Sequence, residues 1–415
     1  MLETSINPSQ SPGTVIIGAG HAGGSVAAFL RQNGFTGSIT LIGEESLEPY
    51  QRPPLSKAWL KGEANEETLR LRPVEFYLEN RIQLYLSARV DAIGRSARLV
   101  RMRDGKTVNY DNLILATGAR ARTAPFEGTS LPVVLELRTA ADAEKLKLAL
   151  RPGARVVIVG GGYVGLEVAA SARALGAEVV VVEREARPLA RVACSQLSNF
   201  FLRYHSQRGV TFRLGRSVSS VQMLDGMASV CLDDGERLPA DLVLVGVGAV
   251  PNEELARHAG LRCDDGVLVD LSARTDDPSI YAIGDCTRRP LPLYNRNVRL
   301  ESVPNALEQA KQAAASICNL AAPKPETPWF WSDQFDVKLQ IAGLPMDVAE
   351  LVVRGDPDED RFAVFHVSAD QRIQAVEAVN AVPEFMMGRQ LIGARTEISI
   401  ERLRDPNISM KEVAI

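Results

Sequence analysis

Two glycine-rich segments of the same design constrain the fold of this chain more than any other feature. Residues 18–23 read Gly-Ala-Gly-His-Ala-Gly, and residues 160–165 read Gly-Gly-Gly-Tyr-Val-Gly. Each follows a short run of Val and Ile and precedes a helix-forming stretch, a second apolar run and an acidic residue. In such a βαβ unit the first glycine allows a tight turn, the second lets a phosphate approach the backbone, and the third lets the helix pack on the strand. The chain is therefore predicted to hold two dinucleotides.

The acidic residue after each motif indicates which dinucleotide the unit prefers. A carboxylate there accepts a hydrogen bond from a ribose 2′-hydroxyl and repels a 2′-phosphate, so Glu183 favours NADH over NADPH. Arg184 either weakens this preference or is an ordinary solvated charge. The alternative for each motif is a glycine turn that binds nothing, which the flanking strand, helix and acid disfavour. The residues that match the pattern are Gly18, Gly20, Gly23 and Glu44 in the first unit, and Gly160, Gly162, Gly165 and Glu183 in the second.

Length and composition describe a multidomain globular chain. Its 415 residues are more than a single hydrophobic core usually accommodates, so we expect more than one domain. A content of 46% hydrophobic and 24% charged residues is typical of globular proteins. No apolar run approaches the roughly 18 residues of a membrane span. Residues 1–12 lack the basic and apolar parts of a signal peptide, so we expect a frayed tail and a cytoplasmic protein. A net charge of −4 gives no general attraction to nucleic acid.

The cysteines and histidines show no redox or metal-ligand spacing. The chain has five cysteines and four histidines, scattered without any Cys-x-x-Cys pair. We therefore expect reduced, inert thiols and no metal site.

The order of apolar runs predicts two doubly wound halves and a further domain. Residues 155–159, 178–182 and 241–245 are nearly continuous in Val, Leu and Ile, which is typical of parallel strands covered on both faces. A proline-rich linker spans 321–328. Beyond it, alternation such as that at 362–367 predicts an antiparallel α+β domain.

Two further segments are candidates for cofactor contacts. Residues 275–285 end a predicted strand in Gly284-Asp285, where a carboxylate is suited to a polyhydroxyl chain. Residues 301–305 (Glu-Ser-Val-Pro-Asn) open a helix expected from Ala306 to about Leu320, with Pro304 in its first turn. The positive end of that helix could stabilise negative charge on a ligand. Both segments also have a purely structural interpretation.

With these motifs the chain resembles the putidaredoxin reductase-like group of FAD-containing, NADH-dependent ferredoxin reductases, which serve bacterial oxygenase and cytochrome P450 systems. The group shares the glutathione reductase fold. The resemblance covers nearly the whole length and is carried by both glycine motifs, Arg-Pro-Pro-Leu-Ser-Lys at 52–57, Ala-Thr-Gly at 116–118, Gly284-Asp285, Glu-Ser-Val-Pro-Asn-Ala at 301–306 and Trp-Phe-Trp-Ser-Asp-Gln at 329–334.

The resemblance implies an α/β fold with two Rossmann-like dinucleotide-binding domains and a C-terminal α+β domain. It implies a discontinuous FAD-binding domain at 13–124 and 250–328, an NAD-binding domain at 125–249 and the C-terminal domain at 329–415. The implied FAD contacts are Gly18, Gly20, Ala22, Gly23, Glu44, Arg52, Lys57, Val90, Thr117, Gly118, Asp285 and Val303. The implied NAD contacts are Gly160, Gly162, Tyr163, Val164, Gly165, Glu183 and Gly248.

Three residues are implied to take part in catalysis. Lys57 would lie near flavin N5, Glu167 would pair with that lysine, and Trp331 would close over the isoalloxazine ring. The structural alternatives are a surface lysine after a proline loop, a helix acid favoured by the dipole, and an aromatic residue that packs a domain junction.

The implied activity is transfer of a hydride from NADH to flavin N5, followed by one-electron transfers to a [2Fe–2S] ferredoxin. That ferredoxin would feed a cytochrome P450 or a ring-hydroxylating oxygenase. The expected protein is a monomer or weak homodimer with no membrane partner. The arginines considered for docking an acidic ferredoxin, or else as part of a mixed solvated surface, are Arg296, Arg299, Arg372 and Arg389.

Two other functions compete with this one. NADH oxidases and peroxide reductases of the wider group use a reactive cysteine in the region where this chain has residues 52–57, which contain none. A signalling flavoprotein like apoptosis-inducing factor is disfavoured by the acidic composition and the lack of a targeting segment.

Overall fold

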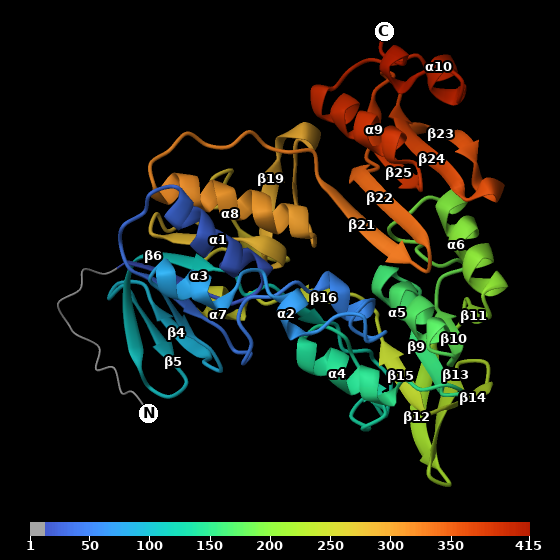
Figure 1. Ribbon diagram of the computed structural model, residues 1–415, viewed down its shortest axis with the longest axis horizontal. Helices are drawn as coiled ribbons and strands as arrows, with labels where there is room; N and C mark the ends of the chain where they lie inside the picture. Colours follow the sequence, from blue (N-terminus) through green and yellow to red (C-terminus); the bar gives the residue numbers. More distant parts are fainter. Residues whose placement is uncertain (1–12) are drawn as a thin grey trace. The chain divides into compact units, whose positions relative to one another are not determined.

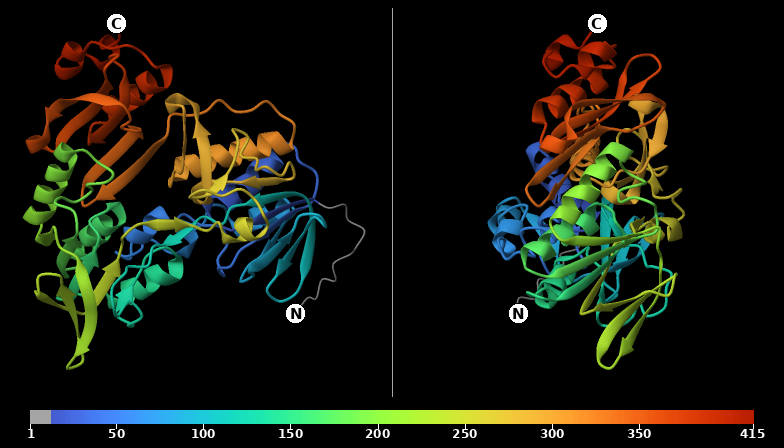
Figure 2. Two further views of the ribbon diagram at one scale, coloured as in Figure 1. Left: turned by 180° about the vertical axis from the view of Figure 1, so that it is seen from behind. Right: turned by 90° about the vertical axis from the view of Figure 1, so that its right-hand side faces the viewer.

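The computed structural model describes residues 13–415, so the expectation for residues 1–12 lies outside the described part of the chain. By their internal contacts the residues form two compact units (Figures 1 and 2). The first comprises the described part of Met1–Gln51, with Glu66–Arg120 and Val250–Glu326; the second comprises Arg52–Asn65, Ala121–Ala249 and Thr327–Ile415. Among the described helices, none is both long and apolar enough to cross a membrane.

The first unit is built on a sheet whose central strands are parallel and apolar on both faces. Side chains of Val, Ile and Leu on the first two strands are buried throughout, as strands covered from both sides require. In spatial order the sheet consists of β3 (Ile82–Tyr85), β2 (Ile39–Ile42), β1 (Gly13–Ile17), β6 (Thr107–Leu115), β5 (Leu99–Met102) and β4 (Val90–Gly94), and β18 (Ile280–Ala282) pairs with β6. The pairs of β5 with β6 and of β4 with β5 are antiparallel.

Two long helices pack together in this unit. α1 (His21–Gln32) and α8 (Val303–Ile317) lie side by side over the sheet (Figure 1). Alanines of both helices, with Val26 and Leu30, are buried in the same core as Ile16 and Ile114 of the sheet. The unit also contains α2 (Glu66–Leu69), α3 (Val74–Glu79), α7 (Glu254–His258), the 3₁₀ turns η2 (Gly284–Cys286) and η3 (Pro292–Tyr294), and a small sheet of β17 (Val267–Leu268), β19 (Thr287–Leu291) and β20 (Arg296–Val298).

The second unit repeats the parallel βαβ design. Its sheet runs β11 (Val210–Leu214), β10 (Glu178–Glu183), β9 (Arg155–Val159), β15 (Leu242–Val245) and β8 (Val134–Leu135). All pairs in it are parallel. An antiparallel sheet of β12 (Val218–Leu224), β13 (Met227–Leu232) and β14 (Arg237–Ala240) packs against it. The helices are α4 (Ala140–Ala149), α5 (Tyr163–Ala174) and α6 (Ser195–Gln207). β7 (Ala119–Ala121) pairs with β16 (Ala249–Pro251).

The C-terminal part of the second unit is an antiparallel sheet with helices beside it (Figure 1). Phe200, Phe201 and Leu197 of α6 share a core with Leu339 and Phe362 of this sheet, which explains why both belong to one unit. The sheet order is β21 (Trp329–Gln334), β22 (Val337–Gly343), β25 (Ile373–Val379), β24 (Arg361–Ser368) and β23 (Val348–Asp356), followed by α9 (Val382–Ala394) and α10 (Ile400–Arg404).

These sheets confirm the predicted fold class: two Rossmann-like regions with parallel strands and a C-terminal antiparallel α+β region. One boundary differs. α8 begins at Val303 and ends at Ile317, three residues before each predicted end. The reason lies in its cap, because the Ser302 hydroxyl accepts a hydrogen bond from the Asn305 N–H and so fixes the start before Pro304.

Candidate functional site

The first glycine turn leaves no room for a side chain at two of its positions. Gly18 has a φ of +111°, and a Cβ there would lie 2.1 Å from the Ala116 carbonyl oxygen. A Cβ on Gly23 would lie 1.9 Å from the Gly18 carbonyl oxygen. Gly20 precedes α1 and offers no side-chain cap, and the first turn of α1 has no acidic residue. The N–H groups that begin α1 are thus left without an acidic or capping side chain, as an anion site requires.

The second glycine turn repeats this geometry in the second unit. Gly160 has a φ of +106°, and a Cβ there would lie 2.5 Å from the Gly246 carbonyl oxygen. A Cβ on Gly165 would lie 2.4 Å from the Gly160 carbonyl oxygen, whereas one on Gly162 would meet no protein atom within 4 Å. α5 also starts without a side-chain cap or an acid in its first turn. Val164 is 46% exposed beside this turn, which leaves an aliphatic surface for a ligand.

The acidic residues of the two units have different surroundings. Glu183 accepts hydrogen bonds from the Gly161 N–H at 2.7 Å and the Glu185 N–H at 2.9 Å, so its carboxylate is fixed against the glycine turn. The exposed Arg184 pairs with Glu185 at 3.2 Å. In the first unit Glu44 is exposed and pairs with Arg89 at 3.0 Å.

Near the first glycine turn, a buried histidine atom has no hydrogen-bond partner. The ring of His21 follows Gly20 at the start of α1, and its Nδ1 is buried and unpaired within the described structure. Burial lowers the pKa of His21, an effect that the negative charge of Asp285 partly offsets. Asp285 lies in η2 directly after Gly284, which has a φ of +78°. A neutral imidazole with an open nitrogen is a ready partner for a polar ligand.

The N-terminus of α8 is tied to η2 by one glutamine. Gln309 Oε1 accepts from the Gly284 N–H at 2.8 Å, the Thr287 hydroxyl at 2.9 Å and the Asn305 amide at 3.2 Å. Beside it, the buried Arg289 and Glu308 form an ion pair at 3.0 Å. This network fixes Asp285 and Val303, because it joins the turn that carries one to the helix that begins at the other.

The remaining first-unit candidates lie on β4 and at the end of β6. Val90 is 8% exposed at the start of β4. The Thr117 hydroxyl donates to the Asn252 carbonyl oxygen at 2.7 Å, and the Asn252 amide donates to the Thr117 carbonyl oxygen at 2.8 Å. The Asn252 N–H also donates to the carbonyl oxygen of Gly118, so three hydrogen bonds to one residue hold this turn.

In the second unit Lys57 and Glu167 form a largely buried ion pair. Lys57 follows the 3₁₀ turn η1 (Pro53–Ser56), and its Nζ lies 2.6 Å from Glu167 Oε2 on α5. Glu167 also accepts from the hydroxyls of Ser56 and Ser332. Ser171, one turn further along α5, donates to the Ser56 carbonyl oxygen at 2.8 Å. α5 begins at Tyr163 with no acid in its first turn, so the helix dipole does not explain Glu167.

The other second-unit candidates have partners of their own. Trp331 is partly exposed on β21, and its ring centre lies 5.6 Å from that of Trp329. Arg52 donates to the Arg138 carbonyl oxygen at 2.6 Å. Tyr163 packs edge-to-face on Phe330 at 4.9 Å. Its hydroxyl donates to the Val192 carbonyl oxygen, and burial raises its pKa. Gly248 has a φ of +113°, which favours glycine.

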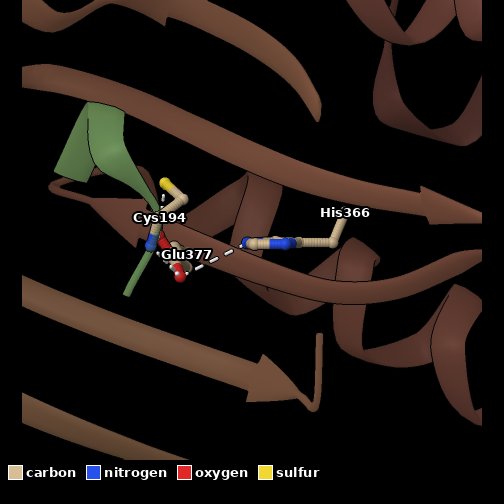
Figure 3. A group of neighbouring side chains, drawn as sticks. All are labelled: Cys194, His366 and Glu377. Atoms are coloured by element: carbon tan, nitrogen blue, oxygen red, sulfur yellow. Dashed lines mark hydrogen bonds and ion pairs between the residues drawn. The ribbon is translucent and has the colours of Figure 1, made fainter. Parts of the chain in front are cut away.

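The structure also brings together three residues that the sequence left scattered: Cys194, His366 and Glu377 (Figure 3). Glu377 accepts from the Cys194 N–H at 3.1 Å and from its Sγ at 2.8 Å, and His366 Nε2 lies 3.3 Å from the same carboxylate. The Sγ–Oε2 separation is that of a hydrogen bond and is shorter than the roughly 3.6 Å between two ligands of one tetrahedral zinc ion. We interpret this group as a buried set of polar contacts that connects the start of α6 to strands β24 and β25.

The five cysteines all lie in the described residues, and none is in a disulfide. Burial raises the pKa of the Cys194, Cys286 and Cys318 thiols, and raises that of Cys263 to about 11. A thiol with a raised pKa is a poor nucleophile near neutral pH.

Comparison with known proteins finds two family models that together match most of the chain, and relatives that are similar over nearly its full length. Residues 13–310 match the pyridine nucleotide-disulphide oxidoreductase family, and residues 329–414 match the reductase C-terminal family. The chain is 49% identical over 403 residues to the probable ferredoxin reductase CtmF of Castellaniella defragrans, with 97% of this chain and 98% of that protein covered. It is 43% identical over 398 residues to the rhodocoxin reductase of Rhodococcus erythropolis, with 96% and 93% covered. The structure is similar to that of putidaredoxin reductase in its covalent complex with putidaredoxin, with a TM-score of 0.94, 40% identity and 98% of each chain covered.

Proposed function

Because this chain belongs to the pyridine nucleotide-disulphide oxidoreductase family, we propose that it is an NADH-dependent, FAD-containing reductase that passes electrons to a [2Fe–2S] ferredoxin. That ferredoxin serves a cytochrome P450 or a ring-hydroxylating oxygenase. The names of the relatives support this function. One relative is named as a probable ferredoxin reductase and another as a rhodocoxin reductase. The similar solved structure is that of a reductase in complex with putidaredoxin.

The residues of the first unit fit FAD. The uncapped start of α1, the open Nδ1 of His21 and the carboxylate of Asp285 offer donors and acceptors of the kinds that a pyrophosphate and a polyhydroxyl chain need. We assign FAD binding to residues 13–124 and 250–328, with contacts from Gly18, Gly20, Ala22, Gly23, Glu44, Arg52, Lys57, Val90, Thr117, Gly118, Asp285 and Val303. By internal contacts, residues 52–65 group with the second unit.

The residues of the second unit fit NADH. The uncapped start of α5 and the open space at Gly162 suit the pyrophosphate, and the exposed Val164 suits an apolar part of the dinucleotide. Glu183 supplies the carboxylate that accepts from a 2′-hydroxyl and repels a 2′-phosphate. We assign NAD binding to residues 125–249, and residues 329–415 to the C-terminal domain that carries Trp331.

When bound, FAD supplies the chemistry of accepting a hydride at N5 and releasing electrons singly. The chain's part is to bind, orient and exclude water. Lys57, held by Glu167 and by the Pro53 carbonyl oxygen, presents a fixed positive charge that we assign to the N5 edge. The positive end of α8 at Val303, where Ser302 caps the N–H of Asn305, is assigned to the pyrimidine edge, where negative charge gathers on reduction.

One observation carries the choice of an electron carrier as acceptor: the segment that ends at Lys57 contains no cysteine, while the similarity to ferredoxin reductases is full-length. Thiol-based peroxide or disulfide chemistry needs a reactive cysteine beside the flavin. Here the positions 52–57 hold Arg-Pro-Pro-Leu-Ser-Lys, and Ser56 is committed to a hydrogen bond with Glu167.

A coupled assay tests this function. The purified protein, saturated with FAD, is mixed with NADH and cytochrome c, with and without each of several [2Fe–2S] ferredoxins. We expect at least one ferredoxin to stimulate cytochrome c reduction strongly, with little consumption of oxygen. Rapid NADH oxidation that no ferredoxin stimulates, with peroxide or water as the product, would transfer the assignment to the oxidase class.

A further inference from the structure

A run of hydrogen bonds leads from Glu167 through β21 to a buried histidine on α6. The Ser332 hydroxyl donates to Glu167 Oε1 at 2.7 Å, and the Gln334 amide nitrogen donates to Ser332 Oγ at 3.1 Å. His205 Nε2 lies 2.8 Å from Gln334 Oε1. All of these residues belong to the second unit, and Ser332, Gln334 and His205 are fully buried. The run therefore links α5, β21 and α6 without contact with water.

Each hydrogen in this run points toward Glu167. A carboxylate can only accept, so Ser332 must give its single hydrogen to Glu167 and accept from Gln334. The Gln334 amide then faces Ser332 with its nitrogen and His205 with its oxygen. The reverse orientation of the amide would require Ser332 to donate to Gln334, and Glu167 would lose a donor. His205 consequently carries its hydrogen on Nε2.

The surroundings of His205 favour this neutral tautomer. Its ring lies among Phe201, Phe212 and Phe335, with ring centres 5.0 to 6.3 Å away. Burial lowers the pKa of His205 to about 4, against a partial increase from Gln334, and the charge of Arg208 lowers it further. Nδ1 is buried and has no partner among the described residues, as expected for the nitrogen without a hydrogen.

A buried run of this kind needs a reason, because an apolar strand face would stabilise the fold at least as well. Residues 330, 332 and 334 lie on one face of β21 since side chains alternate along a strand. Phe330 packs on Tyr163, whereas Ser332 and Gln334 put polar groups into the same interior. If they were left unpaired, these buried polar groups would destabilise the fold. Their pairing ends on the one buried carboxylate that also holds Lys57.

We propose that Ser332, Gln334 and His205 are positioning residues, which hold the Glu167 carboxylate in one orientation so that Lys57 keeps one position and its ion-pair partner. The inference rests on the proposed function, since it takes Lys57 to act on bound FAD. In the described structure the hydrogen bonds of Lys57 go to Pro53, Ser56 and Glu167, so each of the three positioning residues acts through Glu167.

The test uses the FAD-loaded full-length protein and two measurements. Rapid mixing with NADH gives the limiting rate of flavin reduction and the NADH concentration for half of that rate. Chemical reductive titration gives the midpoint potential of the bound flavin without using NADH. The variants are Ser332→Ala, Ser332→Thr, which keeps the hydroxyl, and Gln334→Glu, which replaces the donor by an acceptor of equal size. Ser198→Ala is the matched control, because Ser198 is a fully buried serine of the same unit whose hydroxyl bonds the Pro188 carbonyl oxygen.

We expect Ser332→Ala to lower the limiting rate about tenfold, the equivalent of one hydrogen bond to a charged group, with little change in half-saturating NADH. The midpoint potential should become less negative, because a loosened carboxylate compensates the charge of Lys57 less well. Ser332→Thr should restore both the limiting rate and the midpoint potential. Gln334→Glu should change both quantities more than Ser332→Ala does. Thermal unfolding identifies variants that fail to fold; if Gln334→Glu is one, the two Ser332 variants decide.

Rates and potentials of Ser332→Ala that equal those of Ser198→Ala, while Lys57→Met changes both, would overturn the positioning role and leave the proposed function intact. If instead NADH fails to reduce the flavin of the unchanged protein, the proposed function fails. The chemically measured potentials of the Ser332 variants would still decide whether the run acts on the flavin site.

Discussion

At the scale of single residues, the most informative side chain is Glu183, because it holds the glycine turn and is the residue that we propose selects the nucleotide. Its carboxylate accepts from two backbone N–H groups of the turn regions around it, at Gly161 and Glu185. This fixes the oxygens beside the position where an adenosine ribose would lie in a Rossmann unit. We therefore expect removal of the side chain to alter both the turn and the preference for a ribose without phosphate.

A pair of substitutions separates these effects. Glu183→Gln keeps an acceptor but removes the charge, and Glu183→Ala removes both. We expect the ratio of kcat/KM for NADH to that for NADPH to fall about tenfold or more in Glu183→Ala, and less in Glu183→Gln. Glu178→Ala, at the exposed other end of β10, should leave the ratio unchanged. Equal ratios in all four proteins would remove Glu183 from nucleotide selection.

His205 predicts a pH dependence of stability. Its pKa in the folded protein is about 4, below the usual unfolded value of about 6.5, so the unfolded chain binds this proton more readily. The contribution of neutral, buried His205 to the free energy of unfolding is thus fully present above about pH 6.5. It is lost, at about 1.4 kcal/mol per pH unit, as the pH falls toward 4. His205→Gln should lessen the drop in Tm between pH 7 and pH 5, whereas replacement of the exposed His258 should not. An unchanged drop in His205→Gln would contradict this assignment.

At the scale of elements, the strand–turn–helix units were the most predictable part of the molecule. β1, β9, β10 and β15 follow from short Val- and Ile-rich runs, and the glycines mark both turns. The information is local, since each turn needs its glycines within six consecutive residues. The start of α8 lies three residues before the expected Ala306, because the capping bond of Ser302 places residues 303–305 inside the helix.

The glycines of the second turn allow a test of ligand approach. A Cβ at Gly162 meets no protein atom, and its φ of −81° suits alanine. Gly162→Ala should therefore change the unfolding free energy by less than about 0.5 kcal/mol, yet weaken NADH binding about tenfold or more by blocking the pyrophosphate. Gly165→Ala should instead destabilise the fold by about 2 kcal/mol or more, since its Cβ would lie 2.4 Å from a carbonyl oxygen. Thermal unfolding and NADH titration measure both. Full NADH affinity in Gly162→Ala would place the nucleotide elsewhere.

At the scale of the whole molecule, the sequence could not show which distant residues meet. The pairing of Lys57 with Glu167 was an expectation from family resemblance, and their 110-residue separation leaves no local signal. Ser332 and Gln334 stood within a family motif, but nothing in the sequence connected them with His205. The group of Cys194, His366 and Glu377 was missed for the same reason, because only the packing of α6 on the C-terminal sheet brings it together.

The cysteines give a prediction for the molecule as a whole. Reduction by NADH should bleach the flavin and leave the thiol count at five, because no disulfide exists to accept electrons. The count is taken with a thiol reagent in denaturant before and after anaerobic reduction. A count that rises on reduction would show a redox-active disulfide in the isolated protein and would favour the thiol-dependent class.

The most direct test of the central claim is the electron balance between NADH and a [2Fe–2S] ferredoxin. The unchanged protein, in catalytic amount and without oxygen, is mixed with limiting NADH and excess oxidised ferredoxin, and reduced ferredoxin is counted from its spectrum. A protein that receives electrons in pairs and delivers them singly should yield two reduced ferredoxins for each NADH. No ferredoxin reduction by any candidate, while NADH still reduces the flavin, would contradict the account.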